Sequence, residues 1–150
     1  MDDPFDFSDI GSKREKNSSI FKCKESRFHV IKEVPIGKIQ LRGDSFTSGV
    51  HHELMIILEN AIQIRISRTN GSDTFQLDAI SAGSYDKNVL VEKKITDKKI
   101  NARTALCAFS KARESRPYYD QADCQSFANE VYKIITGEST TPQVDEEDFM

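Results

Sequence analysis

The stretch "VHHELMIILENAIQIRIS" (residues 50–67) constrains the fold more than any other part of the chain. Its dense Ile, Leu and Met residues are followed by Glu59-Asn60 and then by isoleucines at alternate positions from Ile62 to Ile66. Apolar runs on both sides of a polar turn, with a period of two after it, are typical of a β-hairpin that buries one face. The stretch therefore predicts two paired strands.

Further β-type segments lie on both sides of the hairpin. Residues 18–34 carry alternating apolar positions that predict one or two strands. Residues 36–43 and 74–81 each predict a short strand, and residues 88–95 continue the β character. The first part of the domain is therefore expected to consist of strands.

The periodicity changes after these strands. In "NARTALCAFSKARES" (residues 101–115) apolar residues recur at helical spacing, and Pro117 is expected to end this helix. From Cys124 to Thr136 apolar residues again fall on one helical face, and Gly137 is well placed just past the C-terminus. Strands first and helices last predict an α+β domain, in which an antiparallel sheet packs against helices.

Length and charge bound the class of protein. A chain of 150 residues suits one domain, and a net charge of −3 gives no strong attraction to nucleic-acid phosphates. Residues 1–19 and 138–150 are too polar to offset the entropy of ordering, so we expect a disordered leader and an acidic disordered tail. The folded domain is then predicted to cover residues 20–137.

The cysteines and the N-terminus indicate the compartment. Cys23, Cys107 and Cys124 are widely spaced and form no CxxC pair, so neither a disulfide framework nor a zinc ribbon is indicated. The first residues lack the cationic start and apolar run of a signal peptide, and no window approaches the roughly 18 apolar residues of a membrane span. We expect a cytoplasmic protein without an integral membrane segment.

Cys124 is the first candidate for chemistry. Asp123 is a good helix N-cap residue, which places Cys124 in the first turn of the helix, where unpaired N–H groups and the helix dipole favour a thiolate. The acidic side chains of Asp120 and Asp123 weaken this electrostatic argument. The alternative is an inert thiol that packs as a small apolar group beneath the helix.

A nucleophilic thiol requires a base, and His51 and His52 stand at the start of the most apolar strand. Adjacent strand residues face opposite sides, so only one of these two histidines can point at a given cleft. Gln63 and Arg65 are polar residues on the return strand of the hairpin, from which a side chain such as that of Gln63 is expected to reach and orient the imidazole. The alternative for Gln63 is a side chain that faces solvent.

The motifs "HHELMIILENAIQI", "FSKARESRPYYDQ" and "DCQSFANEVYKIITG" resemble the histidine strand, the lead-in and the cysteine helix of the lecithin:retinol acyltransferase-like family. The resemblance spans roughly residues 35–137. It implies a circularly permuted papain-like fold of the NlpC type and chemistry on acyl esters, with lipids as the substrate class. No metal or organic cofactor is implied.

The resemblance assigns roles to four residues. Cys124 is the expected nucleophile, His52 or His51 the general base, and Gln63 the residue that holds the ring; aligning the hairpin turn favours His52, whereas an ungapped count favours His51. The chain is thus expected to act as a cysteine acyltransferase or hydrolase through a thioester, reaching lipid esters peripherally at membranes.

Two alternatives remain open at this point. Asp123, Gln125 and Ser126 stand where the family usually has Asn, Glu and His, which favours a catalytically inactive module that binds a protein partner. A thiol peptidase or amidase would use the same site.

Overall fold

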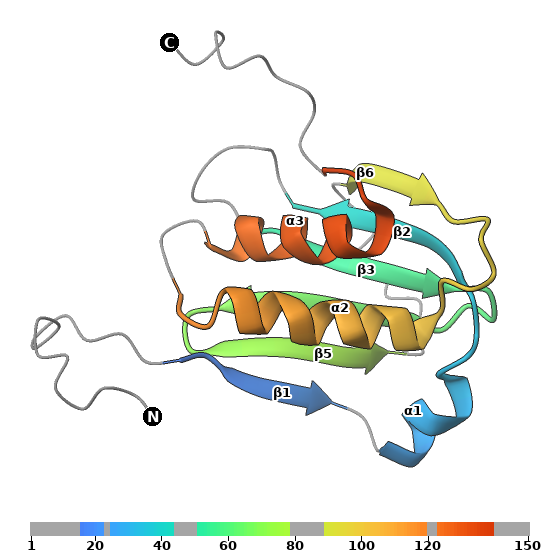
Figure 1. Cartoon of the computed structure of the whole chain (residues 1–150), viewed down its shortest axis with the longest axis horizontal. Helices are drawn as coiled ribbons and strands as arrows, with labels where there is room; N and C mark the ends of the chain where they lie inside the picture. The colour runs from blue at the N-terminus through green and yellow to red at the C-terminus, as the bar shows by residue number, and fades with distance from the viewer. Residues whose placement is uncertain (1–15, 23–24, 44–50, 79–88, 120–122, 140–150) are drawn as a thin grey trace, which may run out of the picture.

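The computed structural model of the chain describes residues 16–22, 25–43, 51–78, 89–119 and 123–139. Within these ranges six strands form one sheet in the order β1-β5-β4-β3-β2-β6 (Figure 1). The strands are β1 (Ser18–Lys22), β2 (Ile36–Arg42), β3 (Glu53–Leu58), β4 (Gln63–Thr69), β5 (Ser72–Asp78) and β6 (Val89–Lys94). β1 runs parallel to β5, and the other neighbouring strands are antiparallel.

Three helices accompany the sheet: α1 (Glu25–Ile31), α2 (Ala102–Ser115) and α3 (Asp123–Thr136). α2 and α3 lie side by side across one face of the sheet (Figure 1). α2 begins with a capping box, in which Asn101 accepts from the Thr104 backbone and Thr104 accepts from the Asn101 backbone. α3 is followed by Gly137 at a φ of 80°, the left-handed conformation that glycine adopts without strain.

The hydrophobic core lies between the sheet and these two helices. Alternate residues of the central strands point into it, so that Ile56 of β3 lies opposite Ile64 of β4 and both are fully buried. Phe75 of β5 contacts Phe109 of α2, which in turn contacts Phe127 of α3, with ring centroids 5.6 and 5.9 Å apart. The aromatic residues thus join the sheet to both helices.

The predicted α+β class, the hairpin and both long helices are confirmed. The predicted antiparallel sheet is in fact mixed, because β1 pairs in parallel with β5 at the sheet edge while the other pairs are antiparallel. The strand interpretation of residues 18–34 is right only for β1, since Glu25–Ile31 forms helix α1. Phe28 and Ile31, which are one helical turn apart, pack on the core, while Val30 is exposed. The apolar residues of this segment fit helical spacing as well as the alternation of a strand.

The predicted boundary of the leader is also wrong. Asn17 is buried and donates from Nδ2 to the carbonyl of Thr69 and to Asp73 Oδ1, and β1 begins at Ser18. A short polar segment is ordered here because the β4–β5 hairpin satisfies its hydrogen bonds. At the other end Glu138 pairs with Lys93 at 2.7 Å, and Ser139 donates to Asn129 Oδ1 at 3.2 Å. Residues 140–150 of the predicted tail lie outside the described residues, as does Cys23.

Candidate functional site

Most of the residues that are candidates for chemistry lie at one end of the sheet. The start of β3, the end of β4, the start of β5, the end of α2 and the start of α3 all lie at this end (Figure 1). We call it the Cys124 end of the fold. Cys124 lies in the first turn of α3, as the sequence predicts, but Asp123, which was expected to be the N-cap, is the first residue of the helix. α3 packs on β3 and β4. The Cys124 side chain is buried, with 7% of its surface exposed.

The two histidines have different surroundings. His51 is exposed, and its Nε2 lies 3.7 Å from Glu53 Oε1 on the sheet face opposite α3. His52 is buried beside Gly43, where a Cβ atom would come within 2.5 Å of the imidazole Cδ2 and 3.1 Å of Nε2. By strand alternation His52 shares the face of Leu54, which is the face that the helices cover. His52, and not His51, therefore lies on the sheet face that carries α3.

Gly43 offers a test of how tightly the imidazole is held. Gly43→Ala is expected to push the His52 ring from its position and to lower the free energy of unfolding by about 1–3 kcal/mol, because the added methyl overlaps the ring and also meets the His51 carbonyl. Chemical denaturation and the His52 ring signals in NMR spectra measure both effects.

Gly37→Ala is the matched control. A Cβ atom at Gly37 would lie 3.3 Å from its nearest neighbour, the Ile57 carbonyl oxygen. Because Gly37 is at the opposite end of β2 from Gly43, the His52 signals should stay in place. Unchanged His52 signals in Gly43→Ala would show that the glycine does not set the ring position.

The structure places Gln63 away from this site. In the β3–β4 ladder Glu53 lies opposite Ser67, while Gln63 lies opposite Ile57 near the hairpin turn. His52 and Ile57 are five positions apart along the chain, about 16 Å in an extended strand. The register contradicts the predicted role of Gln63 as the group that orients the imidazole.

Gln63 instead belongs to a polar layer on the sheet face opposite the helices. Its Oε1 is buried without a hydrogen-bond partner among the described residues. In the same layer Arg65 donates to Gln76 at 3.1 Å, and Gln40 donates to Glu92 at 2.7 Å. The amide of Gln40 lowers the pKa of Glu92, with Lys38 contributing by its charge.

The polar residue at the Cys124 end of β4 is Arg68, which sequence interpretation missed. Extending the ladder one residue beyond the pair of Glu53 and Ser67 places Arg68 beside His52. Arg68 is fully buried and forms a bidentate ion pair with Asp73, with Nε 2.6 Å from Oδ1 and Nη2 2.8 Å from Oδ2. Counting outward from the hairpin turn would have identified this position.

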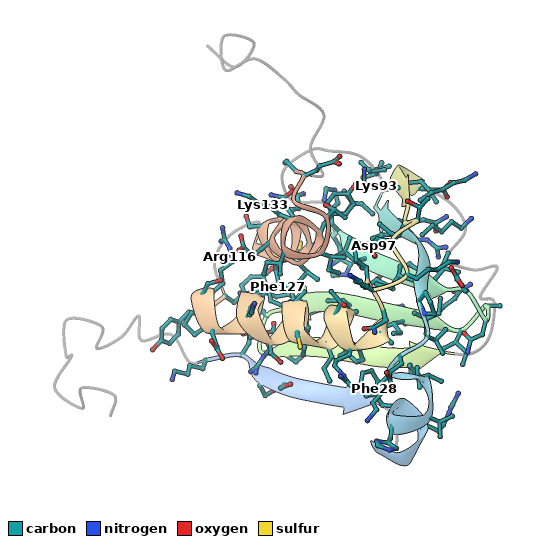
Figure 2. All side chains as sticks on the ribbon, turned by 45° about the vertical axis from the view of Figure 1, so that its right-hand side comes forward. Phe28, Lys93, Asp97, Arg116, Phe127 and Lys133 are labelled. Carbon is teal, nitrogen blue, oxygen red and sulfur yellow. The ribbon has the colours of Figure 1, made fainter. Side chains whose placement is uncertain are left out.

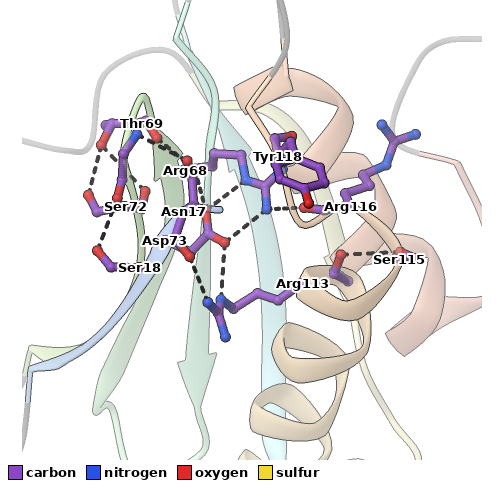
Figure 3. Close-up of polar contacts among 12 residues, drawn as sticks. Asn17, Ser18, Arg68, Thr69, Ser72, Asp73, Arg113, Ser115, Arg116 and Tyr118 are labelled. Carbon is purple, nitrogen blue, oxygen red and sulfur yellow. Dashed lines mark hydrogen bonds and ion pairs between the residues drawn. The ribbon is translucent and has the colours of Figure 1, made fainter. Parts of the chain in front are cut away.

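Other groups complete a buried polar cluster around this ion pair (Figure 3). Arg113 of α2 donates from Nε to Asp73 Oδ2 at 3.1 Å and from Nη2 to the Asn17 carbonyl at 2.9 Å. Arg68 also donates to the carbonyls of Arg116 and Tyr118, in the segment that leads from α2 towards Cys124. The cluster therefore ties β1, the β4–β5 hairpin and the α2–α3 connection together.

The surface next to this cluster is hollowed. A depression of about 360 Å³ is lined by Lys16, Asn17, Arg113, Glu114 and Pro117. Within the described ranges no group of three or more His, Cys, Asp and Glu side chains is placed to hold a metal ion. The chemistry that this end of the fold offers is that of a thiol, an imidazole and a buried guanidinium.

Comparison of the chain with protein-family models, with curated proteins and with solved structures finds no match. None of the described helices is long and apolar enough to cross a membrane.

Proposed function

We propose that the chain is a cysteine acyltransferase or hydrolase that acts on acyl esters, with lipid esters as the substrate class. The proposal includes a permuted papain-like fold of the lecithin:retinol acyltransferase-like type, as the sequence motifs suggest. One observation carries it: buried Cys124 in the first turn of α3 and buried His52 just before β3 lie at the same end of the sheet. A thiol nucleophile and an imidazole base from these two elements are what thioester chemistry requires.

The reaction proceeds in two steps. His52 accepts the proton of the Cys124 thiol, and the thiolate attacks the ester carbonyl. The C–O bond breaks, the alcohol leaves with the proton from His52, and the acyl group stays on sulfur as a thioester. Water or an acceptor hydroxyl then attacks the thioester while His52 takes and returns one proton, which releases the acid or the new ester. Backbone N–H groups at the start of α3 supply donors for the oxyanion.

The experiment is mass analysis after incubation with an activated short-chain ester or a short-chain phospholipid. We expect one acyl group on Cys124, removed by hydroxylamine because a thioester is labile to that nucleophile. Cys124→Ser should abolish this adduct, since a hydroxyl is a far weaker nucleophile at neutral pH.

Cys107→Ser is the matched control, because Cys107 is an exposed thiol on α2. That variant should still acquire the adduct on Cys124. An adduct on Cys107 alone, or none with any ester donor, contradicts the acyltransferase proposal.

A non-catalytic binding module is the second candidate. It is favoured by the 7% exposure of Cys124, which also suits a thiol that packs beneath its helix. Its expected result is the absence of adduct with ester and amide donors, together with an unchanged biological role in Cys124→Ala. An adduct formed only from amide donors would favour the peptidase or amidase hypothesis instead.

A further inference from the structure

We infer that Arg68 is the positioning residue of the Cys124 site, which holds the start of α3 against the sheet end that carries His52. Arg68 is the last buried residue of β4 and lies on the same sheet face as Ile64 and Ile66. Its guanidinium reaches from the sheet to the two chain segments that flank Cys124. The Arg68 side chain therefore connects the sheet end that carries His52 with the helix that carries Cys124.

The first connection runs to the segment that precedes Cys124. Arg68 Nη2 donates to the carbonyl of Arg116, and Nη1 donates to the carbonyl of Tyr118 at 3.4 Å. Both carbonyls belong to the connection between α2 and α3, where no regular helix or sheet satisfies them. These bonds hold the chain at Arg116 and Tyr118, in the part of the connection that follows α2.

The second connection runs to α3 itself. The Arg68 Cζ atom lies 4.3 Å from the centroid of the Phe127 ring, and both side chains are fully buried. Phe127 is one helical turn beyond Cys124 and points inward from α3 (Figure 2). A cation over an aromatic face is most favourable when water is excluded, as it is here. Cys124 thus lies between two segments that contact the same guanidinium.

The geometry requires arginine rather than any cation. The planar guanidinium pairs with both oxygens of Asp73, donates to two carbonyls and still presents a face to Phe127. A lysine ammonium keeps the charge but cannot make this set of contacts. Arg113 supplies the contrast, since it also donates to Asp73 but its other bond goes to the carbonyl of Asn17, which directly precedes β1 and does not flank Cys124.

Amide hydrogen exchange tests the positioning itself. The first N–H groups of a helix lack intrahelical partners, so the amides to follow are those of Phe127 and Ala128. Arg68→Lys should speed their exchange about tenfold or more relative to core amides of β3, because charge-assisted bonds to the preceding segment are lost. Arg113→Lys, the matched control, should leave these amides within about twofold of the unchanged protein relative to the same β3 amides.

Acylation of Cys124 tests the consequence, and this part rests on the proposed function. The acylation rate constant in Arg68→Lys should fall about tenfold or more at an unchanged KM, because small misplacements of a nucleophile are costly, whereas Arg113→Lys should retain it. Phe127→Leu, which removes the ring face and keeps an apolar side chain, is the second variant should Arg68→Lys not fold.

Equal exchange in Arg68→Lys and Arg113→Lys, or faster exchange throughout β3 as well, overturns the inference. If the unaltered protein forms no adduct, the proposed function fails, and the exchange measurement alone decides the role of Arg68.

Discussion

Asp73→Asn is expected to lower the free energy of unfolding by about 3–5 kcal/mol, one of the two largest effects that the structure suggests. Asp73 is 1% exposed and accepts from both Arg68 and Arg113. The neutral amide cannot balance a fully buried guanidinium, and its NH₂ group would face donors. Arg113 can turn its partly exposed side chain to solvent, whereas Arg68 cannot. Urea denaturation followed by circular dichroism measures the loss.

Glu53→Gln is the matched control for this prediction. Glu53 also pairs with an arginine of β4, since its Oε2 lies 3.4 Å from Arg65 Nε, but this pair sits on the opposite sheet face and retains some solvent contact. Its removal should cost less than removal of the Asp73 pair, because both side chains of the Glu53 pair keep 12–15% of their surface exposed. Similar decreases in the free energy of unfolding in the two variants would show that the burial of the Asp73 ion pair does not increase its contribution to stability.

At the Cys124 end, the strand pairing can be predicted from the sequence, but the burial of Arg68 and Asp73 cannot. The turn at Asn70-Gly71 places Arg68 opposite Asp73, and period-two alternation puts both on the face of Ile66. A charged residue on a strand nevertheless favours a solvent-facing interpretation. Only the tertiary structure shows that Arg113 of α2 and the connection to α3 supply the partners that make burial tolerable.

The error on Gln63 has a different origin. The sequence predicts the turn at Glu59-Asn60 correctly, but the role predicted for Gln63 pairs a residue early in the return strand with the start of the outgoing strand. In an antiparallel pair the residues closest to the turn meet each other, and so Gln63 lies opposite Ile57. The same counting rule applied outward from the turn reaches Arg68 beside His52.

Helix α1 could not be identified from the local pattern alone. In "ESRFHVI" the apolar residues fit both a period of two and a spacing of three or four, and the segment is too short to separate them. The long helices were predictable because several turns repeat one apolar face and end at Pro117 and Gly137. The placement of Cys124 in a first helical turn follows directly from that longer pattern.

Phe127→Ala is expected to lower the free energy of unfolding by about 3–5 kcal/mol, because a fully buried aromatic ring is replaced by a methyl group. The ring fills the space between α3, Phe109 of α2 and the guanidinium of Arg68, none of which can move in without losing other contacts. Guanidinium chloride denaturation provides the measurement.

Phe28→Ala is the comparison, because Phe28 is only partly buried and its ring meets Phe75 at the edge of the core, at a centroid distance of 5.8 Å. Its truncation should cost less than that of Phe127 since solvent can fill part of the vacated space. A double-mutant cycle of Phe127→Leu and Arg68→Met should then give a coupling energy of about 0.5–2 kcal/mol, as a desolvated cation–π contact does. Additive losses would mean that Phe127 stabilises α3 by packing alone, and the hold of Arg68 on the helix that carries Cys124 would then rest on its bonds to the carbonyls of Arg116 and Tyr118.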